Sequence, residues 1–180
     1  RPHSRAPTHR AASGVLFSKL TQGFAELTQV GLAGEPIPRM FAAQALGSSP
    51  IATAFADDRG ISRVRAQTGF ASLAVGDPSH GDLAIGAARA TQGDILAVDD
   101  DEIADNTSLF QETTGITSDC ATGAALGALV QALRRGRLEH GSRVVLVVTG
   151  AEPQPAGDDV RLQTVAPDAR NVLAALGVES

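Results

Sequence analysis

The sequence is poor in several residue types, and each scarcity excludes or disfavours particular kinds of site, partner or fold. It has no Trp or Tyr and six Phe among 180 residues, so recognition of RNA or single strands by base stacking has almost nothing to work with. A single cysteine excludes an internal disulfide framework and a cysteine-based zinc cage. No apolar run approaches the roughly 20 residues of a membrane span. The formal net charge of −5 argues against a nucleic-acid or anionic-membrane partner.

Lysine is almost absent as well. Of the 15 Lys and Arg residues all but one are Arg, which leaves Lys19 as the only amine side chain. Any lysine chemistry therefore runs through Lys19 or comes from outside these residues. The first residue is Arg1 rather than Met, and we expect a fragment, a processed form or a trimmed chain.

What is present fits one domain with a real core, since 43% of the residues are hydrophobic and 19% are charged. Apolar spacing, caps and turn residues predict helices over residues 13–31, 49–56, 82–91, about 100–115 and 122–135. Short strands are predicted over residues 40–45, 95–98 and 144–148. Helices that alternate with strands indicate an α/β fold, with a mainly parallel sheet and flanking helices.

Two of these predictions are specific enough to test in detail. The strand over 144–148 has four Val among five apolar residues, a pattern typical of a strand buried on both faces. The helix over 122–135 is expected to turn four large side chains inward: Leu126, Leu129, Val130 and Leu133.

The sequence also predicts the domain organisation. Residues 1–12 are expected to be a disordered or foreign tail, residues 13–150 the α/β domain, and residues 151–180 an irregular tail with a short helix.

Three places are candidate binding sites on residue chemistry alone. Ser13 and Gly14 begin a helix, where unpaired backbone N–H groups suit a phosphate. Thr149 follows a predicted strand, at the edge where ligands bind in open α/β sheets. Asp119 opens a polar helix start. Ordinary capping of a helix or turn remains the alternative for all three.

Other reactive side chains favour structural interpretations. Cys120 lies near a helix start, but no neighbouring His pattern supports a nucleophile, and we expect a small buried residue. Lys19 is expected to be solvated on its helix. The four His residues are not spaced as a helical metal pair, and no metal site is expected.

Five stretches, in order, resemble the C-terminal half of threonine synthase, a pyridoxal-phosphate (PLP) enzyme of the tryptophan-synthase-β fold group. Residues 13–24 resemble the helix after the family's phosphate loop, which ends in a Gly-Phe pair. Residues 38–50 are similar to a strand and its "Gln-Ala-x-Gly-Cys-Ser-Pro" turn, with Ser48 where Cys is usual. Residues 72–81 resemble "Ser-x-Ala-Ile-Gly-Asn-Pro…Gly", 112–123 "Arg-Thr-Glu-Gly-Ile-Phe-x-Glu", and 144–150 the final "Val-Val-x-Val-x-Thr-Gly" strand.

This resemblance implies a fold-type-II PLP enzyme and assigns roles to particular residues. The loop before the first helix holds the cofactor phosphate through backbone amides, which implies Ser13, Gly14 and Val15. The Thr of the final strand bonds the pyridine nitrogen, which implies Thr149. Asp119 falls close to the substrate. The implied reaction converts O-phospho-L-homoserine and water to L-threonine and phosphate with pyridoxal 5'-phosphate as cofactor.

The same resemblance implies a small phosphorylated amino acid as ligand, and a complementing N-terminal half or a homodimer as partner. The implied location is the cytoplasm. No residue here matches the family's Schiff-base lysine, because Lys19 corresponds to a position after the phosphate loop. We therefore expect this chain to be inactive on its own. Two alternatives stay open: a non-catalytic α/β interaction module, or part of another fold-type-II enzyme similar to threonine dehydratase or cysteate synthase.

Overall fold

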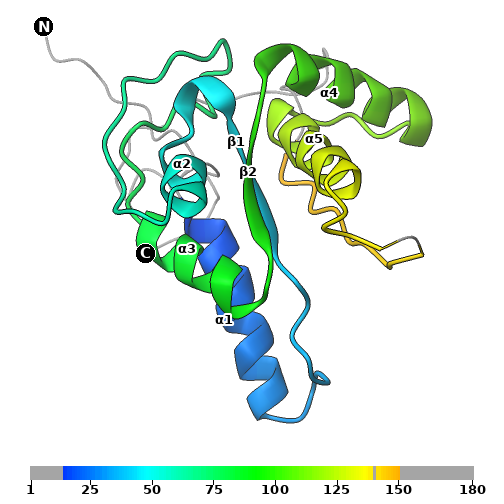
Figure 1. The fold of residues 1–180 in the computed structure, drawn as a ribbon. Coiled ribbons are helices and arrows are strands. Elements are labelled where there is room, and N and C mark those ends of the chain that lie inside the picture. The colour runs from blue at the N-terminus through cyan, green and yellow to red at the C-terminus, as the bar shows by residue number, and fades with distance from the viewer. Residues whose placement is uncertain (1–13, 140, 151–180) are drawn as a thin grey trace, which may run out of the picture.

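The computed structural model describes residues 14–139 and 141–150 (Figure 1). In chain order the elements are α1 (Val15–Gln29), β1 (Phe41–Ala45), the short 3-10 helix η2 (Leu46–Ser48), α2 (Pro50–Ala56), α3 (Gly81–Ala90), β2 (Asp94–Val98), α4 (Asp100–Thr114) and α5 (Cys120–Arg134). None of the helices in these ranges is long and apolar enough to cross a membrane. The predicted tails, residues 1–12 and 151–180, lie outside the described residues.

Two parallel strands form the centre of the fold. β1 pairs with β2 so that Phe41 lies opposite Asp94 and Ala45 opposite Val98. Helices α1, α2 and α3 lie on one side of the strand pair, and α4 and α5 lie on the other (Figure 1). The predicted α/β architecture with a parallel sheet and flanking helices is confirmed.

Local sequence signals place several element boundaries where they were predicted. Asp99 caps α4, because its side chain accepts a 3.0 Å hydrogen bond from the backbone N–H of Asp101. Pro50 is the first residue of α2, where its missing N–H costs nothing. Gly115 ends α4 with a left-handed φ of 70°, a conformation that suits glycine.

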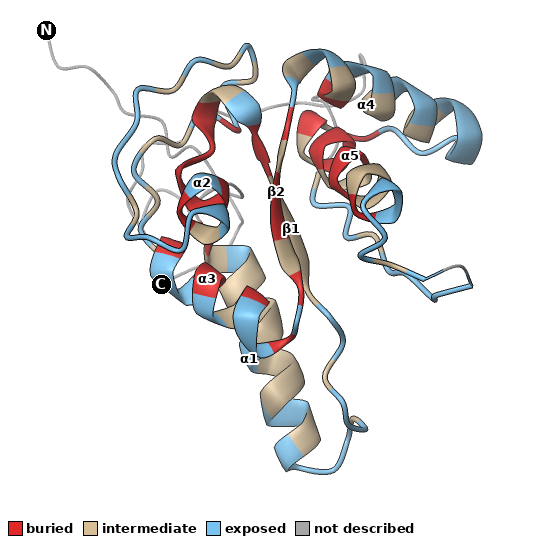
Figure 2. Cartoon of the chain, viewed as in Figure 1, coloured by how far each residue is buried: buried red, intermediate tan, exposed pale blue. Residues whose placement is uncertain are grey.

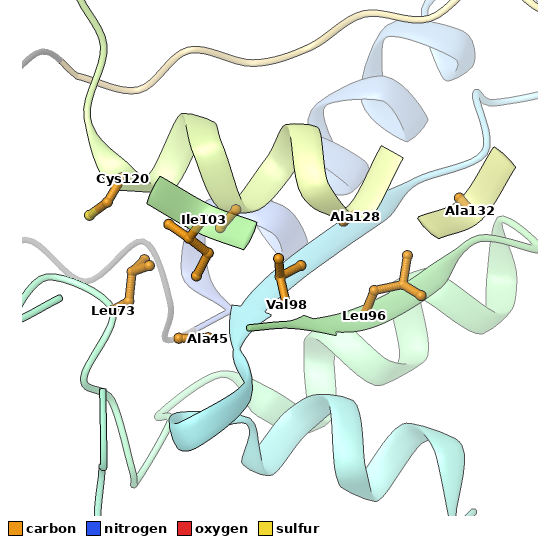
Figure 3. Close-up of a cluster of buried hydrophobic side chains, with 9 residues drawn as sticks. Ala45, Leu73, Leu96, Val98, Ile103, Cys120, Ala128 and Ala132 are labelled. Carbon is orange, nitrogen blue, oxygen red and sulfur yellow. The ribbon is translucent and has the colours of Figure 1, made fainter. Parts of the chain in front are cut away.

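Alternation along the strands gives each face of the sheet its own hydrophobic cluster. Leu96 and Val98 of β2 point into a cluster with α5, whereas Ile95 belongs to a second cluster formed with α2 and α3. Figure 2 shows the buried residues concentrated on the strands, α2 and α5. Members of the first cluster are drawn in Figure 3: Ala45, Leu73, Leu96, Val98, Ile103, Cys120, Ala128 and Ala132.

The predicted inward face of α5 is wrong in part, because Leu126, Leu129 and Val130 are only half-buried and Leu133 is exposed. The helix buries its small residues instead: Thr122, Gly123, Ala124, Gly127, Ala128 and Ala132. Leu133 is 49% exposed. The physical reason is the close approach of α5 to its neighbours, because a Cβ at Gly123 would overlap the carbonyl oxygen of Ile103 in α4. A Cβ at Gly127 would lie 2.6 Å from Val98 Cγ1 in β2.

The predicted strand over residues 144–148 is also wrong. These residues have no regular secondary structure, none is buried, and Val145 is 89% exposed. A strand needs a neighbour to pair its backbone groups. Within the described ranges β1 and β2 pair with each other, and residues 144–148 have no ladder partner. Four Val side chains favour an extended backbone, but they do not provide a neighbouring strand for it to pair with.

A buried side chain of β1 caps the start of α2. The Oε1 atom of Gln44 accepts hydrogen bonds from the backbone N–H groups of Ile51 at 2.9 Å and Ala52 at 3.0 Å. Gln44 is 2% exposed. Because no solvent reaches this helix start, the amide oxygen satisfies donors that water cannot.

We predict that Gln44→Met lowers the free energy of unfolding by about 2–3 kcal/mol, because methionine keeps most of the volume but leaves two buried donors unmatched. The measurement is a denaturant titration. The matched control is Gln22→Met on the exposed face of α1, where the change is expected to stay within about 0.5 kcal/mol. Equal losses in the two variants would contradict the assigned role of Gln44.

Candidate functional site

The start of α5 lies beside the carboxyl ends of both strands. Cys120 shares one hydrophobic cluster with Ala45 and Val98, the last residues of β1 and β2. In Figure 3, Cys120 and Ala45 lie toward the same end of the cluster. In open α/β sheets this edge is where ligands bind, and the sequence predicted such an edge position for Thr149.

Asp119 is the N-cap of α5. Its Oδ1 atom accepts hydrogen bonds from the backbone N–H of Thr122 at 3.2 Å and from the Thr122 hydroxyl at 3.3 Å. Its own backbone N–H donates to the carbonyl oxygen of Gly150 at 3.2 Å. The structure therefore joins Asp119 to Gly150, the residue that follows Thr149. The hydroxyl of the exposed Thr149 has no partner among the described residues.

Cys120 is nearly buried, at 8% exposed, as predicted. Its Sγ atom lies 3.1 Å from the Oγ atom of Ser72, with which it shares a hydrogen bond. This contact ties the loop before α3 to the start of α5. Sequence reasoning missed it, because the two residues lie 48 positions apart and neither residue type signals the other.

Two fully buried hydroxyls near this edge have no hydrogen-bond partner among the described residues. They belong to Ser48, in η2 directly after β1, and to Ser118, immediately before Asp119. The sequence indicated that position 48 is unusual, because Ser48 lies where the family's turn pattern has Cys. A thiol is a weak hydrogen-bonding group, and a hydroxyl in the same position loses more when it is buried without a partner.

We predict that Ser48→Cys raises the free energy of unfolding by about 1 kcal/mol, because the unmatched hydroxyl is removed. The midpoint of a denaturant titration under reducing conditions measures the change. Ser108→Cys on the exposed face of α4 is the control and is expected to stay within about 0.5 kcal/mol of the parent. A clear loss of stability in Ser48→Cys would show that the hydroxyl is stabilising where it lies.

The other predicted cofactor residues lie on the opposite side of the strands, at the start of α1. Gly14, not Ser13, is the N-cap of α1; Ser13 lies outside the described residues. Gly14 has a φ of 83° and is packed against α3, since a Cβ there would lie 2.8 Å from the carbonyl oxygen of His80. Among residues 14–139 and 141–150, no side chain caps this helix. Its first N–H groups, with Val15 at the first helical position, therefore remain available to an anion.

Lys19 is exposed on α1, as predicted. Its Nζ atom donates to Oε1 of Gln22 at 2.8 Å. It lines a shallow pocket of about 230 Å³ between α1 and α3, together with Leu83 and Ala87. The pocket lies on the α1–α3 side of the strands, whereas Asp119 and Thr149-Gly150 lie with α5 on the other side (Figure 1).

The sequence of residues 8–150 matches the family described as pyridoxal-phosphate dependent enzyme. The chain belongs to this family. Among its relatives, chloroplastic threonine synthase 2 of Arabidopsis thaliana is 32% identical over 133 residues, which is 71% of this chain and 25% of that protein. Cysteate synthase of Methanoregula boonei is 33% identical over 81 residues, 45% of this chain and 19% of that protein. The chain thus spans a quarter or less of these relatives' length.

A solved structure supports the fold assignment. The crystal structure of a threonine deaminase (T.th.) superimposes with a TM-score of 0.56 at 14% sequence identity, and the match covers 81% of this chain and 49% of that one. At this identity the likeness concerns the fold alone. The predicted fold-type-II architecture of the PLP-enzyme family is confirmed.

The residues of this chain fit part of a PLP site and do not complete it. The start of α1, which no described side chain caps, suits a phosphate, and the Thr149 hydroxyl, which has no partner among the described residues, suits a ring nitrogen, although the two groups lie on different sides of the strands. The aldehyde of the cofactor requires an amine. The only amine side chain, Lys19, is exposed in the second turn of α1, and its Nζ atom is bonded to Gln22. No reaction step is therefore assigned to the cofactor on these residues.

Proposed function

We propose that this chain is the C-terminal part of a threonine synthase, which converts O-phospho-L-homoserine and water to L-threonine and phosphate. The observation that carries the proposal is the 32% identity to a plant threonine synthase over 133 residues. The family match over residues 8–150 includes both Asp119 and Thr149. The proposal places the enzyme in cytoplasmic amino-acid biosynthesis. The bound cofactor supplies an electron-withdrawing ring for carbanion chemistry in this family.

In this proposal the chain provides residues that surround the cofactor, but not the amine that bonds to the cofactor's aldehyde. Asp119, at the start of α5, is bonded to Gly150, and the hydroxyl of the neighbouring Thr149 has no partner among the described residues. Gly14 and Val15 present the uncapped start of α1. The Schiff-base lysine is supplied by a complementing N-terminal half, and this chain alone is inactive.

The decisive experiment mixes this chain with a separately expressed lysine-bearing half and measures phosphate release from O-phospho-L-homoserine. We expect phosphate and L-threonine from the mixture and none from either part alone. Formation of cysteate or deamination of threonine by the mixture would replace the proposal with one of the two alternative reactions. No activity from a mixture that associates would favour the non-catalytic interaction module.

Lys19→Arg provides a second test. We predict that phosphate release by the completed enzyme stays within about twofold of the parent, because Lys19 is an exposed surface residue and arginine keeps its charge. The control is replacement of the lysine in the complementing half by arginine, which removes the Schiff-base amine and is expected to abolish activity. Loss of activity in Lys19→Arg would place the catalytic amine in this chain.

A further inference from the structure

The segment that carries Thr149 has few attachments of its own. Residues 142–150 form no helix or strand, and they are exposed except for partial burial of Leu146 and Gly150. Among the described residues their backbone makes two hydrogen bonds. One is local, from the N–H of Ser142 to the carbonyl oxygen of Glu139 at 3.1 Å. The other is the bond from the N–H of Asp119 to the oxygen of Gly150, which within the described ranges attaches the Thr149 end of the segment to α5.

The carboxylate of Asp119 also fits against Gly150. A Cβ added to Gly150 would lie 2.8 Å from Oδ2 and 3.5 Å from Cγ of Asp119. The carboxylate cannot move aside freely, because Oδ1 accepts both hydrogen bonds from Thr122, which is fully buried. The cap of α5 and the turn at residues 149–150 therefore interlock.

We propose that Asp119 is a positioning residue that holds the Thr149-Gly150 turn at the start of α5. The aspartate caps the helix with one oxygen, presents its backbone N–H to the turn, and leaves room for a residue without a side chain at position 150. The consequence for catalysis rests on the proposed function: Asp119 acts through the place it gives the Thr149 hydroxyl. Serine at position 119 would keep the cap and free the space of the second oxygen, because serine is an equally good N-cap with a shorter side chain.

Amide hydrogen exchange of the full chain, followed by NMR, tests this proposal without activity. The protection factor of the residue-119 amide reports the bond to Gly150, and that of Ala128, inside α5, reports the helix. In Gly150→Ala we expect protection at residue 119 to fall about tenfold, because the added Cβ pushes the turn from the cap, while Ala128 changes by less than about twofold. Asp119→Ser alone is expected to keep protection at residue 119 within about threefold.

The double variant Asp119→Ser/Gly150→Ala decides the mechanism. We expect it to regain protection at residue 119 to within about threefold of the parent, since the shorter cap accommodates the new Cβ. The proposal is overturned if Gly150→Ala leaves residue 119 protected, if Ala128 loses protection to the same extent, or if the double variant is no better than Gly150→Ala.

In the completed enzyme, Gly150→Ala is expected to lower kcat for phosphate release with little change in KM, and the double variant to recover it. A purely structural role of the turn would not produce this pattern. If exchange behaves as expected while the completed enzyme releases no phosphate, the proposed function fails and the positioning of the turn stands. If the completed enzyme is active but exchange shows no coupling, the positioning proposal alone fails.

Discussion

Gly123→Val is expected to lower the free energy of unfolding by about 3 kcal/mol or more, the upper range for overpacking a core. Gly123 is where α5 crosses α4, and the space of its missing side chain is filled by the carbonyl oxygen of Ile103 and by Thr107, whose backbone nitrogen would lie 3.0 Å from a Cβ. These neighbours are largely backbone within a helix, so they cannot rotate away as a flexible side chain would. Valine therefore forces the two helices apart.

Gly86→Ala is the control for Gly123→Val. Gly86 lies in the middle of α3 and is exposed, and apart from the backbone of α3 itself no described atom lies within 4 Å of the place its Cβ would take. There the substitution is expected to raise stability by about 0.5–1 kcal/mol, because alanine favours the helix over glycine. Denaturant titrations followed by circular dichroism measure both variants. Similar effects of the two substitutions would contradict the close packing of α4 and α5.

Leu96→Ala is expected to cost about 2–5 kcal/mol, the usual range for emptying a leucine site in a core. Leu96 is 1% exposed and lies on β2 between the sheet and α5, where it belongs to the cluster in Figure 3. Small alanine and glycine neighbours on α5 cannot fill the space that its side chain would leave, so much of the cavity is expected to persist.

The matched control is Leu109→Ala on α4. Leu109 is 52% exposed, so its truncation is expected to change stability by no more than about 0.5 kcal/mol. The same denaturant titration serves both leucine variants. A cost at Leu96 as small as that at Leu109 would mean that the strand pair and α5 do not pack as described.

Much of the fold was predictable, because its boundaries depend on local chemistry. Asp99 and Asp119 cap helices through their own side chains, and Gly115 closes α4 in a conformation that glycine adopts without strain. The two short strands were recognised from runs of apolar residues between turn signals, and both lie within a residue of the predicted limits. Each of these signals acts over a few residues, so it is complete within the sequence.

The site was predictable only in part. The family resemblance implied that Asp119 and Thr149 both lie near the active site, and the structure joins Asp119 to Gly150, the neighbour of Thr149. The sequence did not reveal the pairing of Ser72 with Cys120, or the unmatched hydroxyls of Ser48 and Ser118. Those features depend on which segments meet across the fold and on what each side chain finds there.

The scarcity of lysine has a clear meaning by itself. The sequence alone determines that Lys19 is the only amine side chain in residues 1–180. The family resemblance puts Lys19 after the phosphate loop, so our prediction is that the Schiff-base lysine comes from outside these residues. The sequence also determines the family and the alternation of helices and strands, because both follow from the order of residues along the chain.

Only the tertiary structure decided which segments pair as strands and which faces of the helices are buried. Residues 144–148 have the composition of a buried strand but no partner to pair with among the described residues, so they stay irregular. Helix α5 carries an apolar leucine face, yet it buries glycine and alanine, because close approach to α4 and β2 is possible only where side chains are small. Pairing and packing require a second segment, and the identity of that segment is fixed in three dimensions.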